Sequence, residues 1–238
     1  MTEADEHEAE AHEHSHTDVS GGWLRAAVFG AMDGLVTNTA LVAGLGAAAS
    51  SGTVLLGGVA GLVAGAISMA LGEYTSVSTQ NEQLDLEVSK ERRELSMHPE
   101  EERAEMVALW RSRGLDDTLA QQVAAQLALD PEQELSEHTR AELGLDPDEK
   151  PSPWTAAWSS FICFALGALI PLLPYLFGFD EVYAAVALGG VGLFVAGVLS
   201  ARFTARPWWS GGLRQLTMGL LAAGLTYLIG SWIGVPTS

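Results

Sequence analysis

Hydrophobic residues gather in five long stretches that polar segments separate. The stretches run approximately over residues 23–49, 53–75, 154–177, 182–204 and 211–234. Each can cross a hydrocarbon layer of about 30 Å, because that crossing takes roughly 20 helical residues. Tryptophans near the ends of several stretches suit the membrane–water interface. The pattern predicts an all-α membrane protein with five transmembrane helices per chain.

The two longest polar segments, residues 1–22 and 76–153, are both acidic. Residues 1–22 contain seven acids and no base, and alternate histidine with glutamate, so they are expected to form a disordered tail. Residues 76–153 separate the second hydrophobic stretch from the third. The predicted organisation is the tail, transmembrane helices 1–2 at 23–75, an inserted helical domain at 76–153 and transmembrane helices 3–5 at 154–238.

The insert carries the signals of a small helical domain. The second hydrophobic stretch has no helix breaker at its polar end, so its helix should continue as a stalk through Leu95. Pro99, followed by three glutamates, opens a further helix, because the first turn of a helix favours anions. Asp116 and Asp130 should cap two more helices. Eight apolar positions would form the core of this domain: Leu84, Val88, Met106, Leu109, Trp110, Leu119, Val123 and Leu127.

Charge and cysteine content exclude several classes of protein. The chain has 30 acids and 12 bases, a net charge of −18, so it offers no basic surface for nucleic acid. Its one cysteine, Cys163, excludes a disulfide scaffold. Only two of the bases are lysines, and adaptation to high salt would produce the same acidic, lysine-poor composition. The net charge alone therefore does not indicate metal capture.

The bases predict the orientation in the membrane. With a cytoplasmic N-terminus, all 12 Lys and Arg lie in or beside the inside segments, and the outer turns 50–52 and 178–181 have none. Acids count little in this positive-inside rule. The tail and the inserted domain are then cytoplasmic and the C-terminus lies outside. The membrane would be the cell membrane of a prokaryote or the vacuolar membrane of a eukaryote.

An odd number of spans suggests assembly. A transport path between inverted halves is hard to build from five crossings, so we expect a homodimer. The spacing of Gly57, Gly61 and Gly65 would allow close contact between helices, including contact across such a dimer.

Polar groups within the first two spans are candidates for a transport path. Asp33 lies ten residues beyond Trp23, which at about 1.5 Å per residue places it roughly 15 Å deep. A carboxylate there usually marks an ion or proton path, although it can also bond to a neighbouring helix for structural reasons. Two further polar residues, Thr37 and Asn38, follow Asp33 closely in the sequence.

The second span ends with Met69 and Glu73 on one helical face. Met69 alone is more typical of packing. In combination with carboxylates, however, one thioether suits a transition metal such as Fe²⁺ better than Mg²⁺ or Ca²⁺. Glu73 would then lie at the cytoplasmic mouth, with Met69 deeper in the membrane.

Two glutamate pairs in the insert suggest a cation site. Glu91 with Glu94, and Glu102 with Glu105, are spaced so that each pair shares a helical face. Two such faces could supply the oxygen ligands that divalent cations accept. Glutamate is also an ordinary residue of exposed helical faces, so spacing leaves both interpretations open.

These motifs resemble the vacuolar iron transporter family. The resemblance is carried by residues 25–37, which include Gly30, Asp33 and Gly34, by Gly72-Glu73-Tyr74 with the Glu-rich insert, and by residues 168–175 with their two prolines. It covers about residues 22–235. It implies a homodimeric antiporter that moves Fe²⁺, and often Mn²⁺ or other divalent metals, out of the cytosol in exchange for protons.

The resemblance also implies site residues. Asp33 and Met69 would line a path between protomers. Metal would be collected on five glutamates of the insert: Glu91, Glu94, Glu102, Glu105 and Glu142. A plant member has two adjacent methionines where this chain has His138 and Thr139, and His138 could replace one ligand. This departure leaves Fe²⁺, Mn²⁺, Zn²⁺ and Co²⁺ as candidate ions.

Other functions make distinct predictions. A membrane-anchored metal buffer or sensor would bind metal without transporting it, and the intramembrane Asp33 argues against it. The chain lacks Gly-x-Ser-x-Gly and His-Glu-x-x-His motifs and has no histidine within its spans, so we predict no enzyme. The tail histidines could hold Zn²⁺ or Ni²⁺ loosely or simply be solvated: His7, His12, His14 and His16.

Overall fold

The structure, a computed structural model, describes residues 22–144, 146–147, 149–202 and 207–233. The described residues form helices and no strand, which agrees with the predicted all-α class. In chain order the helices are α1 (Gly22–Gly46), α2 (Ser51–Met97), α3 (Pro99–Ser112), α4 (Asp117–Leu127), α5 (Pro131–Leu143), α6 (Pro153–Leu169), the 3₁₀ helix η1 (Ile170–Leu172), α7 (Leu173–Leu176), α8 (Val182–Ala201) and α9 (Trp208–Ile233). The predictions about the histidines of the tail lie outside the described residues.

Five segments in the described part are long and apolar enough to cross a membrane. They are α1, α2, the continuous run from α6 through α7, α8 and α9, which confirms the five predicted stretches. The helical run of the third span is interrupted by η1 at Pro171, since a proline lacks the N–H that a regular α-helix uses.

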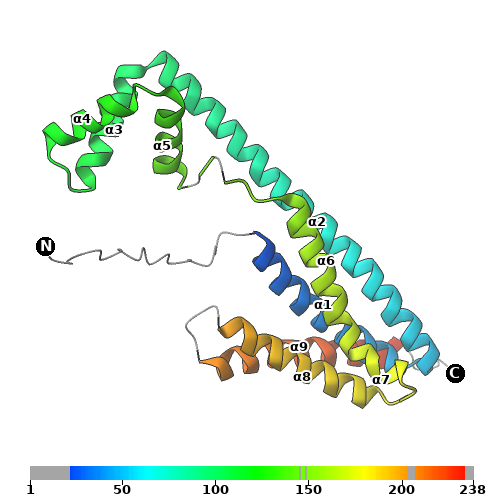
Figure 1. Cartoon of the computed structure of the whole chain (residues 1–238). Coiled ribbons are helices and arrows are strands. Elements are labelled where there is room, and N and C mark those ends of the chain that lie inside the picture. The colour runs from blue at the N-terminus through cyan, green and yellow to red at the C-terminus, as the bar shows by residue number, and fades with distance from the viewer. Residues whose placement is uncertain (1–21, 145, 148, 203–206, 234–238) are drawn as a thin grey trace, which may run out of the picture.

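Helix α2 is the longest element and projects well beyond the bundle. It has 47 residues, about 70 Å at the rise of an α-helix. As predicted, it passes Leu95 without a break, because no glycine or proline interrupts residues 73–97. Figure 1 shows α3, α4 and α5 gathered at its far end, away from α8 and α9. We call these three helices, with the end of α2 that they touch, the α3–α5 unit.

The predicted caps of the α3–α5 unit are present. Pro99 opens α3, the Asp116 carboxylate accepts from the N–H of Leu119, and the Asp130 carboxylate accepts from two N–H groups of α5. Met106, Ala124 and Leu127 form the buried core. The prediction that Leu119 belongs to that core is wrong. It occupies the first turn of α4 and is 47% exposed.

Helix α1 packs most tightly of the five, because half of its apolar window is buried. It interlocks with α6 through glycines: a Cβ on Gly34 would lie 2.2 Å from the Phe164 carbonyl oxygen, and one on Gly167 would lie 2.3 Å from that of Ala31. Each would clash with backbone. The small residues therefore allow the two backbones to touch.

The glycines of α2 have a different role from the one we expected. A Cβ on Gly57, Gly61 or Gly65 would meet a side chain of the same chain, namely Leu45, Leu41 or Phe164. Their spacing serves packing within the protomer, so it is not evidence for a dimer.

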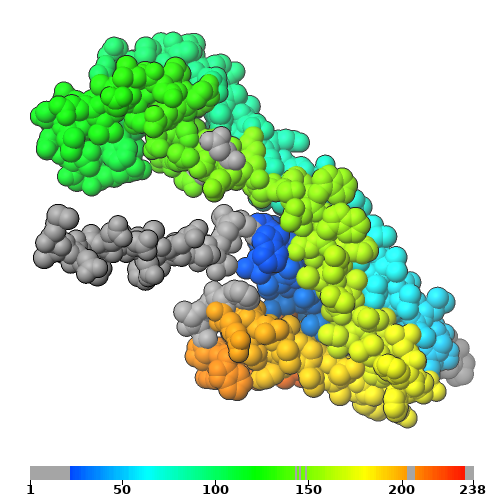
Figure 2. Space-filling model, viewed as in Figure 1, coloured from blue at the N-terminus to red at the C-terminus, as the bar shows by residue number. Residues whose placement is uncertain are grey.

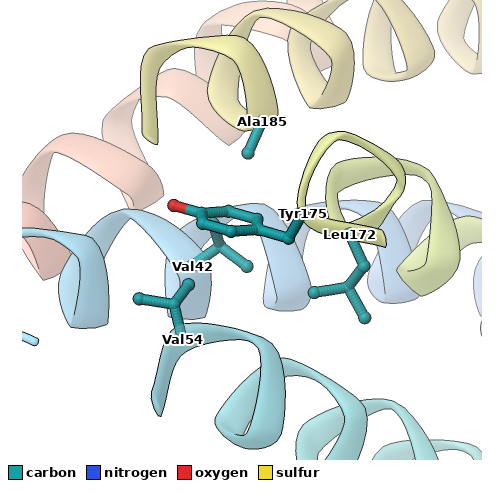
Figure 3. Close-up of a cluster of buried hydrophobic side chains, with 5 residues drawn as sticks. All are labelled: Val42, Val54, Leu172, Tyr175 and Ala185. Atoms are coloured by element: carbon teal, nitrogen blue, oxygen red, sulfur yellow. The ribbon is translucent and has the colours of Figure 1, made fainter. Parts of the chain in front are cut away.

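One end of the bundle is closed by a hydrophobic cluster in which four segments meet. Tyr175 of α7 lies among Val42 of α1, Val54 of α2 and Ala185 of α8, with Leu172 beside it (Figure 3). From the opposite end α2 extends toward the α3–α5 unit, and we call that end of the bundle the insert side. The first turn of α6, the middle of α2 and the start of α1 meet there through Ala156, Val77 and Ala26.

Candidate metal centre and polar groups of the membrane helices

Three helices bring four potential metal ligands together in the α3–α5 unit. They are Glu91 of α2, Glu102 of α3, and His138 and Glu142 of α5. One donor atom from each lies within 4.8 Å of the others. Glu91, Glu102 and His138 are buried, whereas Glu142 is exposed. The arrangement is a cluster of three carboxylates and one imidazole in which only the Glu142 carboxylate is exposed to solvent.

Local structure explains how these side chains converge. The chain reverses at His98, where α2 ends, so that α3 starts beside the last turns of α2. The capped start of α5 is held to α2 by Arg92, whose two terminal nitrogens donate to the Glu132 carboxylate at 2.5 and 2.8 Å. Glu91, adjacent to Arg92, and His138, two turns into α5, can therefore face each other.

Two potential ligand atoms of this cluster have no hydrogen-bond partner. His138 Nδ1 lies 3.0 Å from Glu91 Oε1 and 3.6 Å from Glu102 Oε2. Nevertheless Glu91 Oε1 and His138 Nε2 are buried without any hydrogen bond. An unpaired buried polar atom costs about 1–3 kcal/mol, and each such group calls for an explanation. A cation held between these atoms would supply one.

Burial and mutual repulsion change the acidity of these groups. Burial, and then the charges of Glu142, Glu102, Glu94 and Glu105, raise the pKa of Glu91 from 4.5 to about 7. The pKa of Glu102 rises for the same two reasons. Burial lowers the pKa of His138, against the pull of nearby glutamates. His138 is therefore held in the neutral form that binds a metal, whereas a cation must first displace a proton from the Glu91 carboxyl near neutral pH.

The remaining predicted insert residues form the rim. Glu94 and Glu105 are exposed, yet both raise the pKa of Glu91, so their charges act on the buried carboxylate. A groove of about 330 Å³ between α3 and α5 leads to His138 and Glu142 and includes Glu105 in its lining. Thr139 is buried and donates to the carbonyl of Leu135, so it is committed to the helix.

The polar groups of α1 have two kinds of partner, one within α1 and one in α6. Asp33 is partly buried and accepts a hydrogen bond from Thr37 at 3.1 Å. Asn38 is fully buried, and its amide donates to the carbonyl of Ala168 at 2.5 Å. Its Oδ1 atom has no partner. The structure thus links Thr37 to Asp33, while the amide N–H of Asn38 is committed to α6.

Met69 and Glu73 lie on α2 in different surroundings. Met69 packs against the cluster of Ala66, Phe164 and Ala168. Glu73 is buried at the insert side of the bundle, where Arg25 of α1 donates to it at 2.8 Å. We did not expect this ion pair from the sequence. The two residues are 48 positions apart, and only their similar predicted depth, near the ends of their spans, could have suggested it.

Five candidate spans and an appended acidic cluster define a helical membrane protein with a pocket suited to cations. Residues 24–231 match the VIT family, so the chain belongs to that family, and the resemblance found in its motifs is confirmed.

Similar proteins cover nearly the same length. The "Vacuolar iron transporter" of Acanthamoeba castellanii is 36% identical over 226 residues, which are 91% of this chain and 81% of that protein. "Vacuolar iron transporter 1" of Arabidopsis thaliana is 33% identical over 224 residues, 90% and 88% of the two chains. "VIT-like transporter 1b" of Glycine max is 32% identical over 231 residues, 94% and 83%.

Proposed function

We propose that the protein is a proton-coupled antiporter that exports Fe²⁺, and with it Mn²⁺ or other divalent transition metals, from the cytosol for detoxification or storage. The observation that carries this proposal is a cluster of carboxylates and an imidazole beside α2, the helix that continues into the membrane bundle. Helix α2 bears Glu91 at one end and Met69 and Glu73 within the bundle. Two of the similar proteins are named vacuolar iron transporters, and these names support a metal cargo.

Capture of the cation would begin in the α3–α5 unit. The exposed Glu94, Glu105 and Glu142 attract hydrated cations, and the groove between α3 and α5 leads them to the buried ligands. Oxygen ligands with one imidazole suit Fe²⁺, Mn²⁺, Zn²⁺ and Co²⁺, whereas Mg²⁺ retains its water more strongly. His138 would be the ligand that favours transition metals.

Passage through the membrane would use Glu73, Met69 and Asp33 in that order. A carboxylate can bind either a proton or a metal ion, so Asp33 would exchange one for the other between the two sides of the membrane. The hydroxyl of Thr37 holds one Asp33 oxygen and leaves the other for the ion. This exchange would couple metal export to proton import.

Orientation and assembly belong to the same proposal. Helix α2 leaves the bundle toward the α3–α5 unit on the insert side, where α1 begins with Arg25 and α8 ends next to Arg202. The positive-inside rule makes this the cytoplasmic side and places the C-terminus outside. We also propose a homodimer. Only 17% of the apolar window of α2 is buried, and its exposed side chains recur at helical spacing, so a second copy could cover this face.

Flux measurements in proteoliposomes test the proposal. With a metal-sensitive dye inside and an imposed pH gradient, the protein should accumulate Fe²⁺ or Mn²⁺, and an ionophore that collapses the gradient should stop accumulation. Asp33→Ala should abolish flux without changing elution from a sizing column. Asp180→Ala, which removes an exposed acid between α7 and α8, is the matched control. Unchanged flux in Asp33→Ala would remove the proposed path.

The same experiment separates transport from storage. A membrane-anchored buffer or sensor would bind metal equally well in detergent and in liposomes. It would show no accumulation that depends on the gradient.

A further inference from the structure

The ion pair between Arg25 and Glu73 lies at the insert side of the bundle, between α1 and α2. Helix α2 carries Glu73 inside the bundle and then continues to the α3–α5 unit. Glu73 is therefore the first carboxylate of the bundle on the way from that unit along α2. Its side chain is 8% exposed, whereas that of Arg25 is 58% exposed. The guanidinium thus covers the carboxylate from the solvent side, and Nη2 donates to Oε2 at 2.8 Å. A cation arriving from the insert side would find this carboxylate already occupied by a positive group.

The helices joined by this pair differ in how firmly they are fixed. Helix α1 touches the backbone of α6 directly at Gly34, as the clash of an added Cβ shows. Helix α2 meets α1 through the ends of flexible side chains, such as Leu45 against Gly57. Within the described residues, Arg25–Glu73 is the one side-chain hydrogen bond or ion pair that joins α1 to α2. We therefore expect α2 to shift relative to α1 more easily than α6 can.

We infer that the Arg25 guanidinium competes with cations for the Glu73 carboxylate. A divalent cation must displace this guanidinium to enter the bundle, so Arg25 sets the affinity and selectivity of the Glu73 site. The inference rests on the proposed transport function. An arginine keeps its charge at every physiological pH, so protons alone do not remove the competitor. A monovalent ion gains little over the guanidinium, whereas a divalent ion interacts with the carboxylate more strongly.

Displacement would have a second consequence. Once the cation holds Glu73, α1 and α2 lose the polar contact between them at this end of the bundle. Arg25 is therefore a positioning residue, because it touches the carboxylate and not the ion. Its removal should change the affinity for the ion and leave the rest of the path intact.

Kinetic measurements in proteoliposomes distinguish competition from a structural role. Arg25→Gln frees the carboxylate, so the KM for Mn²⁺ should fall by about three- to tenfold, as expected when an ion pair worth about 1 kcal/mol no longer has to be broken. Glu73→Gln should raise the KM. Arg25→Lys keeps a cation and should restore a KM near that of the natural protein. The double variant should behave like Glu73→Gln.

A matched control removes the same charge elsewhere. Arg214→Gln lies in α9, where the arginine is exposed and forms no ion pair with a described carboxylate, and it should leave the KM unchanged. If Arg25→Gln instead raises the KM, or lowers the maximal rate with KM unchanged, Arg25 is a structural tie and the inference is overturned.

An equilibrium measurement makes the test independent of transport. In detergent, in a Glu91→Gln and Glu102→Gln background that disables the insert, electron paramagnetic resonance reports free and bound Mn²⁺. Arg25→Gln should tighten the remaining site by the same factor. Tighter binding without flux in the natural protein would support the competitor and reject the antiporter. Flux in the natural protein, with KM and binding unchanged by Arg25→Gln, would support the antiporter and reject the competitor.

Discussion

His138 Nδ1 lies 3.0 Å from Glu91 Oε1, yet that oxygen accepts no hydrogen bond. The two atoms approach closely without forming a hydrogen bond. Such an arrangement costs stability in the metal-free protein, because a buried acceptor has lost water without gaining a donor. A close approach without a hydrogen bond is expected where two side chains are positioned to bind the same third group. A metal ion is such a group, since both the carboxylate oxygen and the imidazole nitrogen are metal ligands.

Removing one buried carboxylate should weaken metal binding sharply. Glu91→Gln or Glu102→Gln replaces a charged oxygen with a neutral amide of similar shape, and we expect the affinity for Mn²⁺ to fall by about tenfold or more, the loss typical of disturbed metal sites. Isothermal titration calorimetry on the purified full-length protein measures it. Glu100→Gln, an exposed residue of the first turn of α3, is the control. Equal losses in all three variants would mean that the general charge attracts the ion.

The stability of the metal-free protein should depend on the ionisation of Glu91. Its pKa is about 7 in the folded protein and 4.5 in an unperturbed chain. The folded state therefore binds more protons between these values, and the free energy of unfolding should fall as the pH rises through this range. The loss is on the order of 3 kcal/mol at most. His138, whose pKa is lowered from 6.5, acts in the opposite direction below that pH, so the fall should be clearest above it.

Thermal unfolding of Glu91→Gln checks this dependence. The variant should melt at a higher temperature than the natural protein at about pH 8, and the difference should shrink toward about pH 5. Metal should raise the melting temperature of the natural protein at the higher pH and affect the variant much less. A difference that is constant with pH would show that the Glu91 carboxylate does not titrate in this range.

The imidazole should determine which metal the cluster prefers. His138→Ala removes the nitrogen ligand and leaves the carboxylates, and Zn²⁺ gains more from an imidazole ligand than Mn²⁺, which oxygen ligands suit. We expect the Zn²⁺ affinity to fall several-fold more than the Mn²⁺ affinity, as measured by competition between the two ions. His98→Ala, an exposed histidine at the end of α2, provides the comparison. A parallel loss for both ions would mean that His138 acts by packing.

The sequence was sufficient to predict the helices, because their signals are local. Hydrophobic length gave the five spans, and the absence of a breaker gave the extension of α2 past Leu95. Pro99, Asp116 and Asp130 mark helix starts through interactions within one turn. Burial was less certain. Leu119 shares the apolar pattern of α4 but lies in its first turn, where its side chain is exposed.

The site was only partly predictable, because its geometry is not local. Spacing suggested two glutamate pairs, but the structure takes only the first member of each pair, Glu91 and Glu102, into the buried cluster. His138 was suggested by family resemblance alone. The pairing of Arg25 with Glu73 depends on how α1 and α2 lie against each other, which no periodicity encodes.

The contact between α1 and α6 offers a final prediction about the bundle. Gly34→Ala places a Cβ 2.2 Å from the Phe164 carbonyl oxygen, and backbone cannot move aside as a side chain can. The helices must separate, at a cost of about 1–3 kcal/mol. Gly224→Ala is the matched control, since nothing lies within 4 Å of its added methyl group. Gly34→Ala should melt several degrees lower in detergent, and Gly224→Ala should not.

Flux in the same two variants connects packing to transport. Asp33 precedes Gly34, so a forced separation of α1 from α6 also displaces the carboxylate proposed to bind the ion. Transport by Gly34→Ala should fall at a temperature where the protein is still folded, while Gly224→Ala retains it. If Gly34→Ala melts and transports like the natural protein, the backbone contact between α1 and α6 is looser than the structure has it, and the expectation that α6 is fixed more firmly to α1 than α2 is loses its basis.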